Sequence, residues 1–162
     1  MLVSVIKGLK ITINKKKKEK ATEAQMLELL NHPHVQSWRA IMNAHQKIYR
    51  FLETELLKNN CSIPRFQIFF YLYFHGPISS IELAQLMHVT RGNVSTFITR
   101  LVADKLVYLV TTQERGGKKL IHLSNKGKEQ FESFFPEHIQ RVIKIAPELS
   151  QSAINKLNQI QV

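Results

Sequence analysis

A very short connection between two helix signals most constrains how this chain can fold. Ser79-Ser80-Ile81-Glu82 places a serine three residues before a glutamate, which is the spacing of a capping box at a helix start. After that helix, only His88-Val89 precedes Thr90, which is expected to cap a second amphipathic helix over about 91–104. Two short helices joined in this way indicate a helix-turn-helix.

The hydrophobic period changes after residue 104 from that of a helix to that of strands. Residues 107–112 are mostly β-branched or aromatic, and residues 120–123 form a second short apolar run. The loop between them contains Gly116-Gly117 and three basic side chains, which is typical of a hairpin. Helix, turn, helix and hairpin together predict a mainly α fold with a small β-hairpin wing, a winged helix-turn-helix.

The flanking segments predict further helices. Apolar residues recur at intervals of three and four over 34–58, and another helix begins near Ser62 with a proline in its first turn. After the hairpin, Asn125 is expected to cap a long helix, in which Pro136 should cause a kink or a break. Ser150 is expected to start a last helix.

The net charge of +11 is concentrated in two segments. Residues 1–20 carry seven lysines and one glutamate, whereas residues 63–127 carry eight basic and three acidic side chains, a net charge of +5. The lysine run at 15–20 is either a basic arm for phosphates or an unstructured extension; we favour the extension, because Met26 is an alternative start. The central excess indicates a nucleic-acid partner.

Composition excludes several other classes of protein. A single cysteine rules out an intramolecular disulfide framework, and 44% hydrophobic residues rule out a wholly disordered chain. The apolar residues 2–6 are too few to span a bilayer, and the basic residues follow them, which is the wrong order for a secretory signal. We therefore expect a soluble cytoplasmic protein.

No motif in the chain predicts catalysis. The sequence has no serine elbow and no glycine-rich phosphate loop, so we expect no enzyme activity and no cofactor. His32 and His34 are the only close pair of histidines, and without further ligands at suitable spacing we expect no metal site. Cys61 has no second cysteine to resolve it, so we interpret it as a small buried hydrophobe rather than a redox sensor.

The helix at 91–104 presents small and polar groups opposite its apolar side. At 100° per residue, Gly92, Thr96, Thr99 and Ala103 lie opposite Val94. Such a face is either an ordinary solvent face or one that enters a major groove, and its position beside the turn and the basic hairpin favours DNA. The residues we expect to contact DNA are Ser79, Thr90, Arg91, Asn93, Ser95, Thr96, Thr99 and Arg100 in the helices and Arg115, Lys118 and Lys119 in the wing.

Residues 63–127 resemble the DNA-binding core of the multiple-antibiotic-resistance regulator (MarR) family. The matching stretches are SIELA at 80–84, VTRGNVS at 89–95, LVADKLV at 101–107 and LSNKG at 123–127. The second stretch is also similar to the related glycine-betaine-responsive regulators. Where family members carry an aspartate before the wing arginine, this chain has Glu114 before Arg115.

This resemblance implies a homodimeric, sequence-specific transcriptional regulator, a repressor relieved by a small effector, that binds a pseudo-palindromic operator in double-stranded DNA. It implies dimerisation helices at 22–62 and 128–162 around a winged core at 63–127, which follow a basic tail at 1–21 that the lysine run predicts to be disordered. The implied dimer seam contains Trp38, Tyr49, Phe131, Phe134 and Phe135, and the implied effector site contains Trp38, His45 and Phe69. The alternative is a winged-helix adaptor for protein or RNA, without operator specificity.

Overall fold

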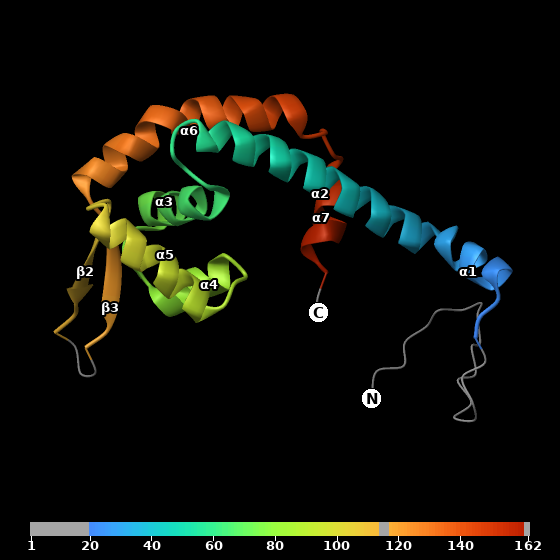
Figure 1. Ribbon diagram of the computed structural model, residues 1–162, viewed down its shortest axis with the longest axis horizontal. Helices are drawn as coiled ribbons and strands as arrows, with labels where there is room; N and C mark the ends of the chain where they lie inside the picture. Colours follow the sequence, from blue (N-terminus) through green and yellow to red (C-terminus); the bar gives the residue numbers. More distant parts are fainter. Residues whose placement is uncertain (1–19, 114–116, 161–162) are drawn as a thin grey trace. The chain divides into compact units, whose positions relative to one another are not determined.

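The computed structural model describes residues 20–113 and 117–160. The disorder predicted for the basic tail, apart from residues 20 and 21, and the DNA contact predicted for Arg115 lie outside these residues. The elements in chain order are α1 (Glu23–Leu30), α2 (Pro33–Leu57), α3 (Ile63–His75), β1 (Ile78–Ser79), α4 (Ser80–Leu86), α5 (Arg91–Ala103), β2 (Val107–Thr111), β3 (Lys119–Leu123), α6 (Asn125–Ile145) and α7 (Gln151–Asn158) (Figure 1). The predicted mainly α fold with a β-hairpin wing is confirmed.

The chain divides into two compact units, residues 1–43 and 44–162, and the boundary falls inside α2. In the first unit, α1 starts at a capping box between Thr22 and Gln25, which the sequence analysis did not identify. No residue of α1 is buried. The functional boundaries after residues 21, 62 and 127 stay predictions.

The second unit contains a three-stranded antiparallel sheet in the order β1-β3-β2. β2 and β3 form the predicted hairpin, with Val107 opposite Leu123 and Thr111 opposite Lys119. β1 is a two-residue strand that pairs with β3 and was not predicted, because two residues carry no recognisable period. This strand anchors the start of α4 beside the wing.

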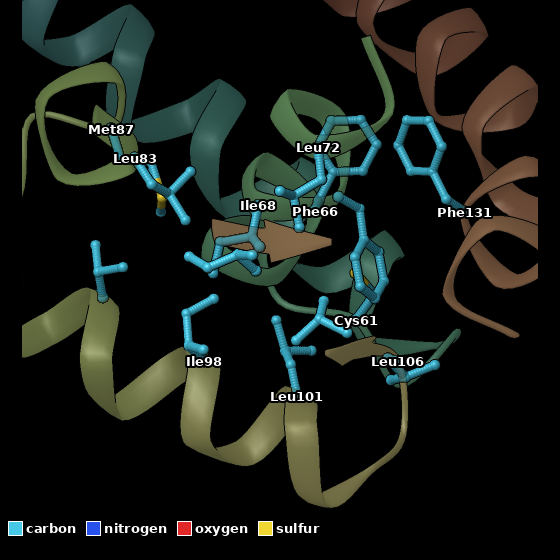
Figure 2. Close-up of a cluster of buried hydrophobic side chains, with 14 of the residues drawn as sticks. Cys61, Phe66, Ile68, Leu72, Leu83, Met87, Ile98, Leu101, Leu106 and Phe131 are labelled. Carbon is cyan, nitrogen blue, oxygen red and sulfur yellow. The ribbon is translucent and has the colours of Figure 1, made fainter. Parts of the chain in front are cut away.

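One hydrophobic core joins the helix-turn-helix to the flanking helices of this unit (Figure 2). It contains Phe66, Ile68, Phe69 and Leu72 of α3, Leu83 of α4, Met87 in the turn after α4, Val94, Ile98 and Leu101 of α5, Leu106 and Ile121 near the wing, and Phe131 and Phe134 of α6. Each such side chain contributes roughly 1.5–3 kcal/mol when fully buried. The rings of Phe66 and Phe131 lie 5.7 Å apart, so α6 is part of this core.

The start of α6 is fixed to the corner between α5 and β2. Ser124, not Asn125, is the N-cap: its hydroxyl accepts from the Gly127 N–H and donates to the carbonyl oxygens of Lys105 (2.8 Å) and Leu106 (3.0 Å). The prediction that Asn125 caps α6 is therefore wrong, because only the serine also satisfies carbonyls of a distant segment.

Two further details differ from expectation. α6 is continuous through Pro136, so the predicted break does not occur. Val102 is 39% exposed although it is apolar, because it lies at the edge of the apolar side of α5. No helix among the described residues is both long and apolar enough to cross a membrane.

Candidate nucleic-acid interface

The helix α5 is held by one side and leaves its other side open. The Thr90 hydroxyl caps its first turn by accepting from the Asn93 N–H (3.3 Å), and Val94, Ile98 and Leu101 are buried in the core. The side opposite these anchors is exposed, as the 100° periodicity predicts. The exposed residues are Arg91, Gly92, Asn93, Ser95, Thr96, Thr99, Arg100 and Ala103.

Hydrogen bonding divides the exposed side chains of α5 into two groups. The hydroxyls of Thr96 and Thr99 donate to the carbonyls of Gly92 (3.1 Å) and Ser95 (2.9 Å) one turn earlier. Within the described part of the chain, the side chains of Arg91, Asn93 and Ser95 form no hydrogen bond. The first two turns of α5 therefore offer donors and acceptors that are not used inside the protein.

Arg100 lies at one flank of this side, next to α3. It lines a pocket of about 120 Å³ together with Ser62, Arg65 and Phe97. Arg65 pairs with Asp104 (3.2 Å), and its Nε is buried without a hydrogen-bond partner. Arg100 thus places positive charge beside the C-terminal half of α5, whereas the charge of Arg65 is paired with Asp104.

Ser79 is not available to DNA in this structure. Only 5% of the residue is exposed, and its hydroxyl both accepts from the Glu82 N–H (3.3 Å) and donates to Glu82 Oε2 (2.7 Å). The predicted capping box is therefore present, and it uses the group that was also predicted to contact DNA. The Ser79 hydrogen bonds, with help from Lys118, lower the pKa of the Glu82 carboxyl to about 2, so it is ionised at neutral pH.

The two described lysines of the wing have different surroundings. Lys118 Nζ lies 2.9 Å from Glu82 Oε1 of α4, so its charge is partly neutralised. Lys119 is exposed and forms no ion pair within the part of the chain that the structure describes. The Lys118–Glu82 pair could not be predicted from the sequence, because the two residues are 36 positions apart.

The residues predicted for an effector site have contrasting exposure. Phe69 is completely buried in the core, so as folded it has no surface for a ligand. His45 is exposed, and its ring centroid lies 5.7 Å from that of Tyr49. Trp38, in the first unit, is 60% exposed. The effector role of these residues stays a prediction for Trp38 and His45.

The residues of the predicted dimer seam also differ in their exposure. Phe131 and Phe134 are 1% and 3% exposed and pack in the chain's own core, so as folded they have almost no surface for a partner, and a seam shared with a partner stays a prediction. Trp38 and Tyr49 are exposed, and Phe135 is partly buried. Helical periodicity shows that one side of α6 is apolar but not which surface covers it.

Two other titratable side chains, Cys61 and His138, have clear surroundings. Cys61 is completely buried, and desolvation raises the pKa of its thiol to about 12. His138, which the sequence analysis overlooked, is buried with its ring centroid 4.1 Å from that of Phe66 and its Nδ1 unpaired. Desolvation and the nearby Arg141 lower the pKa of His138. Among the described residues, no three histidine, cysteine or acidic side chains come together as a metal site.

Comparisons with known proteins agree with this geometry. Residues 62–117 match the model of the MarR family. An uncharacterized HTH-type transcriptional regulator of Bacillus cereus is 30% identical over 89 residues, which are 54% of this chain and only 58% of that protein.

Among the solved structures with a similar fold are those of a transcriptional regulator and a DNA-binding protein. AbsC, a MarR family transcriptional regulator from Streptomyces coelicolor, is 18% identical with a TM-score of 0.67, over 88% of this chain and 92% of AbsC. BpsR of Bordetella bronchiseptica, whose DNA binding is regulated by 6-hydroxynicotinic acid, is 20% identical with a TM-score of 0.65, over 76% of this chain and 96% of BpsR.

Proposed function

We propose that this chain is a sequence-specific DNA-binding transcriptional regulator, and the match of residues 62–117 to the MarR family model supports this proposal. The observation that carries the proposal is the exposed side of α5, where Arg91, Asn93 and Ser95 have no hydrogen bond within the described residues. A free polar face beside a basic wing is what recognition of the major groove requires.

In this proposal the first two turns of α5 contact base edges. Arginine can bind guanine through two hydrogen bonds, and asparagine can bind adenine in the same way, so Arg91 and Asn93 are the specificity residues. Gly92 has only Thr90 Oγ1 near the position of a Cβ, at 3.9 Å, so its open surface allows close approach to the groove. Lys119 and Arg115 contact phosphates, which adds affinity but little sequence preference.

We further propose that the chain acts as a homodimer on a pseudo-palindromic operator. Neither α1 nor α7 contains a buried residue, and an eight-residue helix is marginal in water by itself. Both helices expose large apolar side chains, among them Leu27 and Leu30 of α1 and Ile154 and Leu157 of α7. A second copy would cover these surfaces and hold two α5 helices one DNA turn apart.

The regulatory part of the proposal is repression relieved by a small effector. An effector that prefers a dimer with a different separation of the two α5 helices would lower affinity for the operator. The regulation of BpsR by 6-hydroxynicotinic acid supports this class of mechanism.

The test is to select bound fragments from the source genome and to measure their affinity by fluorescence anisotropy at several salt concentrations. Arg91→Gln is expected to change the preferred sequence and to weaken binding by about 1–3 kcal/mol. Lys144→Gln, an exposed substitution in α6, is the matched control and should change neither. Weak affinity that is equal for all sequences would contradict the proposal.

Light scattering tests the dimer independently of DNA. A monomer at the concentrations used for binding would contradict the operator model. A preference for structured RNA over duplex DNA would favour the winged-helix adaptor instead.

A further inference from the structure

The wing is linked to α4 by an ion pair whose acidic partner is held in place. Glu82 Oε2 accepts hydrogen bonds from the N–H (2.8 Å) and the hydroxyl (2.7 Å) of Ser79, while Glu82 Oε1 faces Lys118 Nζ at 2.9 Å. Both oxygens of the carboxylate are therefore in use. Because the capping box fixes the carboxylate, the longer lysine side chain must come to it.

The backbone of Lys118 is also fixed. Its N–H donates to Thr112 Oγ1 (3.1 Å), and its carbonyl accepts from the Thr112 N–H (2.9 Å). Gly117, which lies between β2 and β3 in the chain, has a φ of +52°, and a Cβ at this position would lie 3.3 Å from Thr111 Cγ2. The Lys118 side chain thus extends from an ordered part of the hairpin to the first turn of α4.

We propose that Glu82 and Lys118 are a positioning pair that fixes the wing against α4, and that Lys118 affects DNA binding through wing placement rather than as a phosphate contact. The proposal rests on the DNA-binding function proposed above. It replaces the phosphate role that the sequence predicted for Lys118 and leaves that role to Lys119.

The two roles predict opposite effects of removing Glu82. If the Glu82 carboxylate were only a negative charge near DNA, its neutralisation would strengthen binding. If Lys118 contacted one phosphate, its loss would lower the slope of log affinity against log salt concentration by about 0.9. If the pair positions the wing, neutralising either partner weakens binding to a similar extent. The effects are then not additive in the double variant, because the second substitution removes an interaction already lost.

The experiment compares Glu82→Gln, Lys118→Gln, their combination, Lys118→Arg and the control Lys119→Gln. Glutamine at position 82 retains the capping box, so α4 stays capped. Amide hydrogen exchange of Thr112 and Lys118 is measured without DNA, and affinity for a selected genomic fragment is measured against salt.

We expect exchange at the two wing amides to be about two- to fivefold faster in each neutralised variant, which is the range for an exposed ion pair. Affinity should fall by a similar factor in each single variant and no further in the double variant. Lys118→Arg should restore both properties. Lys119→Gln should lower the salt slope and leave exchange unchanged.

Unchanged exchange in Glu82→Gln and Lys118→Gln, tighter DNA binding by Glu82→Gln, or additive losses would each overturn the positioning role. A different result would separate the two proposals. If amide exchange responds as expected but the protein binds all DNA sequences weakly and equally, the positioning pair stands and the proposed DNA-binding function is refuted.

Discussion

Gly127 in the first turn of α6 is expected to be intolerant of alanine. A Cβ at this position would overlap the carbonyl oxygen of Leu106 and lie 2.8 Å from Leu123 Cδ1. The leucine side chain can rotate away, but the carbonyl cannot, because the N–H and hydroxyl of Ser124 both donate to it at 3.0 Å. Relief therefore requires α6 to move from the corner between α5 and β2.

The expected loss of stability follows from two opposing effects. Overpacking a buried site costs about 1–3 kcal/mol, and contact with backbone places this site at the upper end. Alanine is favoured over glycine in a helix by up to about 1 kcal/mol, which offsets part of the loss. The net destabilisation is about 2 kcal/mol, or a decrease in Tm of about 4–8 °C for a chain of this size.

Urea unfolding followed by far-UV circular dichroism measures this change. Circular dichroism is chosen over fluorescence because the single tryptophan, Trp38, belongs to the first unit, whereas α6 belongs to the second. Protein concentration must be equal in all samples, because association would raise the midpoint. The reasoning is refuted if Gly127→Ala unfolds at the same urea concentration as the wild type, or at a higher one.

Gly92→Ala is the matched control, since it also changes a glycine in the first turn of a helix. The nearest atom to its Cβ would be Thr90 Oγ1 at 3.9 Å, which is ordinary contact. Stability should be unchanged or higher by up to about 1 kcal/mol. If α5 enters the major groove, the same substitution should weaken DNA binding while the fold is intact.

Three further predictions follow from individual side chains. The buried Cys61 thiol, whose pKa is about 12, should react with iodoacetamide only through unfolding; labelling at the rate of a free thiol would contradict its burial. Because the pKa of His138 is lowered in the folded state, the unfolded chain binds more protons than the folded chain below about pH 6.5. The free energy of unfolding should therefore fall as the pH decreases through that region. His138→Phe should reduce this dependence of unfolding free energy on pH, measured by urea titrations. If the dependence is unchanged in the variant, groups other than His138 cause it. Ser124→Ala should lose about 1–2 kcal/mol of stability, whereas Ser133→Ala, at an exposed position within α6, should change it little.

The order of the elements other than α1 and β1 could be predicted, because their signals are local. Thr90 precedes a three- and four-residue apolar period, and the change to a two-residue period marks the wing. The choice between Ser124 and Asn125 as a cap could not be predicted, because it depends on the carbonyls of Lys105 and Leu106, which are distant in sequence. Which surface covers Phe131 and Phe134 depends in the same way on the placement of α3.

The candidate site was predictable where geometry follows from one helix. The 100° rotation per residue correctly separated the exposed Thr96 and Thr99 from the buried Val94. Ser79 is different, since one hydroxyl was assigned both to a capping box and to DNA. A cap in the first turn of a short helix uses that hydroxyl, so the sequence already contained the conflict that the structure resolves.

The central charge of +5 is not evenly available to a polyanion. The two described acidic side chains of residues 63–127 each pair with a cation: Glu82 with Lys118 beside the wing, and Asp104 with Arg65 beside α3. Both pairs lie at junctions between elements, where they neutralise charge and connect helices. Among the described residues of this segment, the cations outside ion pairs are Arg91, Arg100, Lys105, Lys119 and Lys126. Arg91 and Arg100 lie on the exposed side of α5, and Lys119 lies at the end of the wing. The acidic residues of this segment thus leave the positive charge on the elements that a DNA groove would contact, which is why pairing, and not the net count, decides how the charge is used.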